Sequence, residues 1–316
     1  MARFLSNNDV RGLITVAECV EVMEDLFKQQ AAGLVENLPR QRIRFGSAPG
    51  GGRGAGATLM GGTVLGSHAW GVRLSNIALL YDTNTGALDA LIEPGTLAWI
   101  RTGAASGLAA RHMSRSDASI LGLLGAGRQA VTQLEAIAAV RPLTEVRVFS
   151  RNEDRRRSFV EEHGPRLGLN LVPVATPEAA VRGAHIVCAI TTAQEPVFDG
   201  AHLDPGTCVI AAGSNSWRKR EVDETTIDRA ALIAADNVEQ ARIECGELIW
   251  AVERGALRWG GVRELSDVIS GAVAGRPSED AITLFESQGI GIEDVAGYRY
   301  VLDKALAAGI GVELPF

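Results

Sequence analysis

The sequence lacks the features of several protein classes, and each absence narrows what the chain can do. Among its 316 residues, no apolar run approaches the roughly 20 residues that a helix needs to span a bilayer. The N-terminal segment Met1–Asp9 has no signal-peptide core. A net charge of -7 argues against nucleic acid or an anionic membrane as a partner. These absences predict a cytoplasmic protein.

Cysteine and histidine are too scattered for a disulfide framework or a metal site. The four cysteines are Cys19, Cys188, Cys208 and Cys245, and none of them forms a Cys-x-x-Cys pair. Cys188 and Cys208 lie in apolar segments, where cysteine usually acts as a small hydrophobic residue. The five histidines show no metal-ligand spacing. We therefore expect reduced thiols and no bound metal.

The most informative segment is an apolar strand that runs into Gly-x-Gly-x-x-Ala and then into a helix. It reads Ser119-Ile-Leu-Gly-Leu-Leu-Gly125-Ala126-Gly127-Arg128-Gln129-Ala130. Gly125 permits the tight turn, Gly127 leaves room for a pyrophosphate at the backbone, and Ala130 lets the helix pack close to the strand. The N–H groups and dipole of the helix N-terminus then bind the phosphates. Such a turn also occurs without a ligand, but its strand and helix context predicts a dinucleotide site.

The second strand of this region indicates which dinucleotide binds. NAD sites usually place a carboxylate at its end, to accept a hydrogen bond from the ribose 2′-hydroxyl. Here that place holds Ser150, Arg151 and Asn152, and the next acid, Glu153, is expected to begin a helix. A cation and a hydroxyl suit a 2′-phosphate, and Arg128 is placed to help. We predict NADP, with NAD as the alternative if Arg151 is only a solvated loop residue.

The pattern of elements changes near residue 115. Before it we expect an α+β region with a glycine-rich loop at Pro49–Gly56. Its elements are a helix from the capping box Thr15-x-x-Glu18, strands over 38–45, 77–81 and 87–93, and a helix over 96–113. Later strands are expected at 119–124, 145–149, 171–174, 185–190, 207–212 and 231–234, mostly separated by helices. This alternation predicts an α/β fold with a Rossmann-like, doubly wound parallel sheet.

A set of segments spread over residues 80–310 carries a family resemblance. They are Leu88-x-x-Leu-Ile-Glu93, Arg101-Thr-Gly-Ala-Ala-Ser106, Gly125-Ala-Gly127-Arg-Gln-Ala130, Ala179–Val187, Pro205-Gly-Thr207, Gly213-Ser-Asn215, Arg220-Glu-Val-Asp223 and Phe285–Asp294. In this order they resemble the ornithine cyclodeaminase/mu-crystallin family. The family includes cyclodeaminases that convert ornithine into proline with tightly held NAD, ketimine and pyrroline-carboxylate reductases, and alanine dehydrogenases.

The resemblance implies a reaction and a division of labour. The implied chemistry is hydride exchange between a nicotinamide and the α-carbon of an amino or imino acid, in a homodimer joined through its N-terminal domain. We accordingly predict a substrate-binding and dimerisation domain over 1–115, to which 293–316 returns, and a dinucleotide-binding domain over 116–292. The resemblance also implies that Thr191 and Thr192 contact the cofactor, and that the loop of Ser287 and Gly289 closes over the nicotinamide. Ordinary turn chemistry is the alternative for all four.

Arginines are the expected ligands of the substrate carboxylate, because a guanidinium binds a carboxylate through two parallel hydrogen bonds. Arg101 matches the family's carboxylate-binding arginine, and the alternative is a structural ion pair. Arg40 or Arg42 resembles the second such arginine. Period two places both on one strand face, but the register is open, and a solvated face is the alternative.

Two positions depart from the family pattern. Arg73 stands where the family usually has a proton-transferring lysine, and Asn215 where cyclodeaminases and alanine dehydrogenases have an aspartate. Arginine stays protonated and asparagine does not titrate, although both can orient a substrate. Cyclodeamination needs several proton transfers, whereas imine reduction needs fewer. We therefore predict an NAD(P)-dependent imine reductase or amino-acid dehydrogenase, with ornithine cyclodeaminase or a non-catalytic, mu-crystallin-like nucleotide-binding protein as alternatives.

Overall fold

The computed structural model describes residues 1–44 and 56–315, which form two compact units. One unit joins Met1–Arg101 with Ile290–Phe316, and the other spans Thr102–Gly289. The division falls inside helix α3 (Gly95–Met113). Apart from Gly56, the predicted glycine-rich loop Pro49–Gly56 lies outside the described residues.

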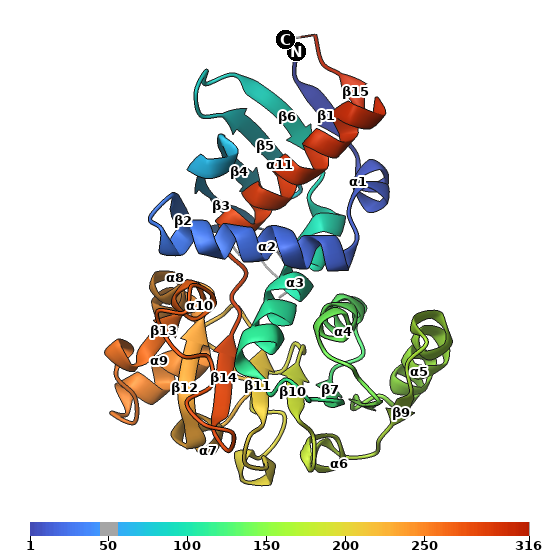
Figure 1. The fold of residues 1–316 in the computed structure, drawn as a ribbon, viewed down its shortest axis with the longest axis vertical. Coiled ribbons are helices and arrows are strands. Elements are labelled where there is room, and N and C mark those ends of the chain that lie inside the picture. The colour runs from blue at the N-terminus through green and yellow to red at the C-terminus, as the bar shows by residue number, and fades with distance from the viewer. Residues whose placement is uncertain (45–55, 316) are drawn as a thin grey trace. The chain divides into compact units, whose positions relative to one another are not determined.

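The first unit is built on one mixed sheet, whose strands follow the order β15-β1-β6-β5-β4-β3-β2 (Figure 1). Its strands are β1 (Arg3–Leu5), β2 (Val35–Arg44), β3 (Gly56–Val64), β4 (Ala69–Leu74), β5 (Ile77–Asp82), β6 (Leu88–Ile92) and β15 (Val312–Glu313). Its helices are α1 (Asn7–Leu13), α2 (Val16–Ala31), the start of α3, α11 (Gly291–Ala308) and the short 3-10 turn η1 (Leu65–Ser67). Strands β1 and β6 pair in parallel, and the other neighbours pair antiparallel.

Helix α11 lies directly on this sheet because small residues permit a close approach. A Cβ atom on Gly291 would come within 2.2 Å of the Gly61 carbonyl oxygen, and one on Gly62 within 2.6 Å of Ile292. The Asn37 side chain on β2 accepts the backbone N–H of Gly291 at 3.0 Å and so caps the helix. The first turn of α11, which follows these contacts, is thereby fixed against the sheet.

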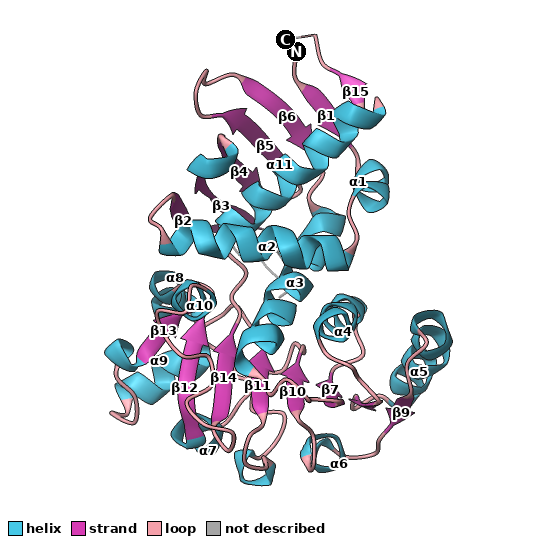
Figure 2. Ribbon diagram, viewed as in Figure 1, coloured by secondary structure: helices cyan, strands magenta, loops and turns pink. Residues whose placement is uncertain are grey.

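The second unit is a parallel sheet with strand order β13-β12-β14-β11-β10-β7-β8-β9, and Figure 2 shows its strands side by side. These strands are β7 (Ile120–Leu124), β8 (Glu145–Phe149), β9 (Leu171–Pro173), β10 (Ile186–Ala189), β11 (Cys208–Ala211), β12 (Ala230–Ala235), β13 (Val262–Glu264) and β14 (Ile282–Glu286). The helices are α4 (Arg128–Val140), α5 (Glu153–Leu167), α6 (Pro177–Val181), α7 (Glu224–Arg229), α8 (Val238–Glu244), α9 (Gly246–Glu253) and α10 (Leu265–Ile269), with 3-10 turns η2 (Gly200–His202) and η3 (Trp259–Gly261). The strand order reverses between β7 and β10, and ligands of doubly wound sheets bind at such a point.

The predicted fold class is confirmed. The helix expected over 96–113 is present as α3, and its glycines have a packing role. A Cβ on Gly103 of α3 would come within 2.4 Å of the Thr132 carbonyl oxygen on α4, and one on Gly107 would come within 3.0 Å of Ala136. The two glycines, one helical turn apart, therefore let α3 pack closely against α4. No helix in the described parts of the chain is long and apolar enough to cross a membrane.

The main omission of the sequence prediction is strand β14. All five of its residues are buried, and it lies between β12 and β11 in the interior of the sheet. The segment Ile282-Thr-Leu-Phe-Glu286 is short, and it carries a threonine and a glutamate in positions that the sheet buries. Periodicity alone does not distinguish such a run from a buried segment of helix. Strands β1, β3, β4, β13 and β15 and helix α1 were also not predicted.

Candidate functional site

Three strands of the first unit bring together two of the predicted arginines. A register shift between Leu38 and Gln41 places Arg40 opposite Met60, with the Arg40 Nη2 atom 3.9 Å from the Met60 sulfur. Met60 in turn pairs with Arg73 on β4. Directly opposed residues in an antiparallel sheet point to the same face, so these side chains lie in one row.

The same register shift gives Arg40 and Arg42, the two candidates for the second carboxylate ligand, different surroundings. Arg40 is 7% exposed, whereas Arg42, which pairs with Thr58, is exposed. The structure therefore favours Arg40 as the member of the row. The substrate-binding role of either residue stays a prediction.

Two carboxylates at the start of α11 bind Arg73 and a third arginine, Arg101. Asp294 accepts hydrogen bonds from Arg73 Nη1 at 2.9 Å and from Arg101 Nε at 2.8 Å. Glu293 accepts one from Arg101 Nη1 at 2.9 Å. We call Arg40, Arg73, Arg101, Glu293 and Asp294 the arginine cluster. Its three guanidinium groups and two carboxylates leave one net positive charge.

Burial and opposite charge act against each other on Arg101. Burial disfavours its charge, but Asp294 and Glu293 raise its pKa above the ordinary value, so the guanidinium remains charged. Arg101 thus occupies the structural ion pair that was the alternative expectation, and its role toward a substrate is untested. Arg73 Nε is buried and finds no hydrogen-bond partner among the described residues.

In the second unit, the dinucleotide turn has the geometry that its glycines predict. Gly125 has φ +122°, and a Cβ there would come within 2.4 Å of the Ile190 carbonyl oxygen. Gly127 precedes α4 as its N-cap, and a Cβ there would meet nothing within 4 Å. Among the described residues, no side chain caps this helix N-terminus, which lies at the strand-order reversal. This arrangement fits a pyrophosphate.

The end of β8 is basic. Asn152 caps α5 by accepting the Arg155 N–H at 2.8 Å, and Arg156 donates to the Ser150 carbonyl oxygen at 3.1 Å. Arg151 is exposed. Glu153 begins α5, as expected, and binds Arg157 at 2.7 Å. Glu153, the first carboxylate after the end of β8, is therefore bound by an arginine of its own helix.

The loops after β10 and β11 are joined by Glu221. One of its oxygens accepts the Thr191 N–H at 2.6 Å, and the other accepts the Gly213 N–H at 2.5 Å. Burial raises the pKa of Glu221 to about 7, although the hydrogen bonds from Thr191 and Gly213 oppose this and Glu247 adds to it. Thr192 and Asn215, which follow these anchor points, are exposed.

A second buried carboxylate fixes the loop after β14. Asp236, at the end of β12, accepts the N–H groups of Gln288 and Gly289, both at 2.7 Å. Gly289 has φ +70°, which favours glycine at this position. Ser287 is buried and its hydroxyl lies 3.5 Å from Asp236. The structure therefore places Thr191, Asn215, Ser287 and Gly289 beyond the carboxyl ends of neighbouring strands.

Sequence reasoning gave no role to these buried acids. Glu221 lies inside a quoted family segment, but nothing in a single sequence shows that it is buried. Glu247, Glu286 and Cys245 bring two carboxylates and a thiol within 4.8 Å of one another. Burial raises the pKa of all three groups, and metals bind the deprotonated forms of such groups. The expectation of no bound metal stays a prediction.

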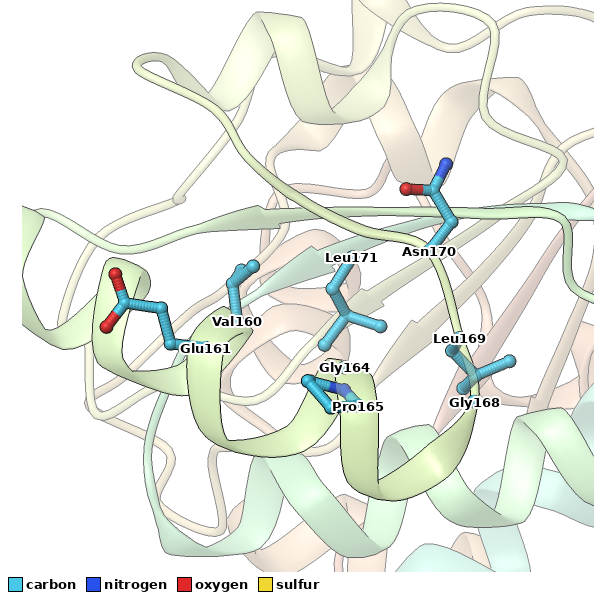
Figure 3. Close-up of a pocket in the computed structure, with 8 residues that line it drawn as sticks. All are labelled: Val160, Glu161, Gly164, Pro165, Gly168, Leu169, Asn170 and Leu171. Atoms are coloured by element: carbon cyan, nitrogen blue, oxygen red, sulfur yellow. The ribbon is translucent and has the colours of Figure 1, made fainter.

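A surface hollow of about 510 Å³ lies elsewhere in the second unit, between the end of α5 and β9 (Figure 3). It is lined by Val160, Glu161, Gly164, Pro165, Gly168, Leu169, Asn170 and Leu171. None of these is a predicted site residue, and the lining carries one carboxylate and one amide. It offers no convergent catalytic groups, so we do not assign the function to it.

The chain matches proteins of one family along nearly its whole length. The sequence profile of the ornithine cyclodeaminase/mu-crystallin family matches residues 2–309. A Delta(1)-pyrroline-2-carboxylate reductase of Bacillus cereus is 30% identical over 328 residues, which cover 99% of this chain and 99% of that protein.

Solved structures agree with this match. The Delta(1)-pyrroline-2-carboxylate reductase of Thermococcus litoralis, solved with NADH and L-proline, has a TM-score of 0.92 at 31% identity and covers 99% of this chain and 100% of its own. An archaeal alanine dehydrogenase, solved as a dimer with bound NAD, has a TM-score of 0.91 at 27% identity and covers 100% of this chain and 99% of its own. The chain therefore belongs to the ornithine cyclodeaminase/mu-crystallin family.

Proposed function

We propose that this protein is an NAD(P)-dependent reductase or dehydrogenase that acts on a small imino or L-α-amino acid, with hydride transfer at the α-carbon. The observation that carries the proposal is the buried arginine cluster of the first unit, in a chain whose second unit has an open dinucleotide turn. The full-length relative that reduces pyrroline-2-carboxylate, and the similar structure that holds NADH and L-proline, support the substrate class.

The arginine cluster suits a carboxylate ligand on electrostatic grounds. Its net positive charge favours an anion, and the buried Nε of Arg73 supplies a hydrogen-bond donor. A carboxylate bound there would form charge-assisted hydrogen bonds away from bulk water, where they are strong. Arg40 lies in the same row of side chains and is the second donor that we assign.

The dinucleotide turn and the loops beyond β10, β11 and β14 would hold the cofactor. A bound nicotinamide supplies or accepts the hydride. Gly125, Ala126, Gly127, Arg128 and Gln129 form the turn that binds the pyrophosphate. Thr191 with Thr192, and the loop of Ser287 and Gly289, orient the ribose and nicotinamide.

The preference between the two cofactors depends on the end of β8. Ser150, Arg151 and Asn152 offer a hydroxyl, a cation and an amide there, and Glu153 is held by its own helix. A 2′-phosphate gains a favourable charge interaction at such a site, whereas a ribose 2′-hydroxyl lacks its usual carboxylate acceptor. We therefore propose NADP as the cofactor, with NAD as the alternative.

Arg73 and Asn215 favour imine reduction over cyclodeamination. Reduction of a protonated imine adds a hydride to carbon and leaves the proton on nitrogen, so it needs no general base in that step. Cyclodeamination also needs proton transfers for ammonia loss and ring closure, which neither an arginine nor an asparagine performs well. Asn215 would orient the imine or a water molecule through its amide.

The proposal is tested by following nicotinamide absorbance with cyclic imino acids, pyrroline-2-carboxylate first, and with L-proline and L-alanine in the reverse direction. We expect turnover with NADPH. Ammonia release from ornithine without net change in the cofactor would instead identify a cyclodeaminase. A folded, cofactor-binding protein that is inactive on the whole panel would overturn the enzymatic proposal.

We also propose a homodimer formed through the first unit. The face of the sheet opposite α11 carries Trp70, Val72, Leu79, Tyr81 and Leu91, all half-exposed. Such a continuous apolar face is typical of an interface between subunits. Sedimentation of the protein, with Leu79→Asp as the disrupting variant, tests this, and a monomeric wild type would contradict it.

A further inference from the structure

Glu221 joins the loops that follow two neighbouring parallel strands. Its Oε1 atom accepts the N–H of Thr191 after β10, at 2.6 Å, and its Oε2 atom accepts the N–H of Gly213 after β11, at 2.5 Å. Each oxygen of a single buried carboxylate thus serves a different loop. Two short hydrogen bonds to one side chain therefore hold the two loops together.

The two loops also touch directly, and only glycine permits this contact. A Cβ on Gly213 would come within 2.3 Å of both the nitrogen and the oxygen of Thr191, and within 2.6 Å of Glu221 Oε1. A side chain at this position would therefore displace the backbone of the opposite loop or break a hydrogen bond to Glu221. Gly213 lets the two loops come close because it has no side chain. Glu221 then holds them together by accepting a hydrogen bond from each.

Glu221 is itself held in place from α9. Its backbone N–H donates to Glu247 Oε1 at 2.6 Å, in the first turn of that helix. At the start of the same helix, a Cβ on Gly246 would come within 2.1 Å of the Lys219 carbonyl oxygen. Trp250 Nε1 donates to the Trp217 carbonyl oxygen at 3.2 Å. The segment from Gly213 to Glu221, which includes Asn215, is therefore anchored at both ends.

We propose that Glu221 is a positioning residue that sets the placement of Thr191 relative to Asn215. Through these two residues it aligns the nicotinamide end of the cofactor with the imine of the substrate. Glu221 needs no contact with either ligand. The roles of Thr191 and Asn215 rest on the proposed function, whereas the link between their loops does not.

The chemistry of the link requires a carboxylate of this length. An amide at position 221 has one accepting oxygen, and its NH2 group would face a backbone N–H, donor against donor. Glu221→Gln therefore loses one of the two loop contacts and keeps the volume. Gly213→Ala disturbs the same link from the opposite side without changing Glu221.

Glu264 provides a matched control on the edge strand β13. It is half-buried, burial raises its pKa to about 7 as for Glu221, and it accepts one backbone N–H, from Val238 at 3.0 Å. Glu264→Gln therefore removes a comparable carboxylate that does not join the Thr191 and Gly213 loops. A loss that comes only from a destabilised fold should appear in both variants.

The experiment compares the wild type with Glu221→Gln, Gly213→Ala and Glu264→Gln in three measurements. These are hydrogen exchange in the peptides that contain Thr191 and Gly213, NADPH affinity by nicotinamide fluorescence, and kcat and KM for pyrroline-2-carboxylate. For Glu221→Gln and Gly213→Ala we expect faster exchange in both peptides, about tenfold weaker NADPH binding, and kcat lowered about tenfold with a smaller change in substrate KM. Glu264→Gln should stay within about twofold of the wild type in affinity and kcat.

Exchange, affinity and kcat of Glu221→Gln equal to those of Glu264→Gln would overturn the proposal. So would a change in substrate KM alone, because misalignment at the reacting atoms lowers kcat. If the wild type reduces none of the imines, the proposed function fails. Hydrogen exchange and NADPH affinity then still decide whether Glu221 links the two loops.

Discussion

The two units hold their buried charges in different ways. In the first unit, Arg101 lies between Glu293 and Asp294, so each charge faces an opposite one. In the second unit, Glu221 binds backbone N–H groups and lies beside another acid, Glu247. Both arrangements satisfy hydrogen bonds, but only the first pairs opposite charges.

The difference determines which unit responds to pH. Opposite charge raises the pKa of Arg101, and its guanidinium therefore keeps its charge over the whole physiological range. Backbone N–H groups offset only part of the burial penalty, and the pKa of Glu221 rises to about 7. The first unit thus contains a buried arginine that stays charged, whereas the second contains carboxyl groups that change charge near neutral pH.

Removal of one cluster carboxylate should have the largest effect. Asp294→Asn leaves Arg73 and Arg101 without their shared partner in a buried place, which should lower the free energy of unfolding by about 3–5 kcal/mol. Urea denaturation measures it. Asp303→Asn, on the exposed side of the same helix, is the control, because loss of its surface pair with Arg299 should cost less than about 1 kcal/mol. Equal losses would show that the buried pairing contributes little.

The second unit should make stability depend on pH. The folded-state pKa of Glu221 is about 7, against a usual 4.5, so the folded protein keeps a proton that the unfolded chain has already released. Stability is therefore greatest below pH 4.5 as far as this group is concerned, and falls as pH rises to 7, by roughly 3 kcal/mol for this shift. Denaturation between pH 5 and 8 measures the slope. Glu221→Gln should flatten it, and an unchanged slope would assign the effect to other groups.

Local rules predicted most of the fold because each depends on a short segment. The capping box at Thr15 starts α2, and the glycines at 125 and 127 form the expected turn before α4. The interior strand β14 was missed because its position depends on neighbours that are distant in the sequence. Helix α1 is an exception, because its capping box of Ser6 and Asp9 is a local signal that the prediction did not use.

The same limit applies to the site. The family resemblance singled out Arg73 and Arg101, but their acidic partners lie near the other end of the chain and have no local signature. The choice between Arg40 and Arg42 depends on a β-bulge that shifts the register, which the alternating pattern does not reveal. Glu221 has the sequence context of a surface acid, and only the fold shows that it is buried.

The arginine row of the first unit is tested by the two neighbouring candidates on β2. Arg40→Met removes a buried guanidinium beside Met60 and should lower kcat/KM for pyrroline-2-carboxylate about 10- to 100-fold, mainly through KM. Arg42→Met removes an exposed one and should change it less than about twofold. The reverse ranking would place Arg42, rather than Arg40, at the substrate. Equal unfolding midpoints for the two variants would exclude a stability effect.

The smallest expected effect concerns an exposed charge of the second unit, where solvent weakens electrostatics. Arg151→Asp replaces a cation at the end of β8 by the carboxylate that NAD sites usually have. It should weaken NADPH binding about tenfold, or ~1.4 kcal/mol, and improve NADH binding by less, since the new acid must also be placed to accept from the ribose 2′-hydroxyl. Fluorescence titration with both cofactors measures the ratio, and Arg155→Asp at an exposed position of helix α5 is the control for net charge. If the two variants shift the ratio of NADPH to NADH affinity equally, Arg151 acts only through the net charge of this region and not through a direct contact with the cofactor. A wild type that binds NADH more tightly than NADPH would reverse the assignment of this site. It would also show that the exposed Arg151 does not select a cofactor with a 2′-phosphate.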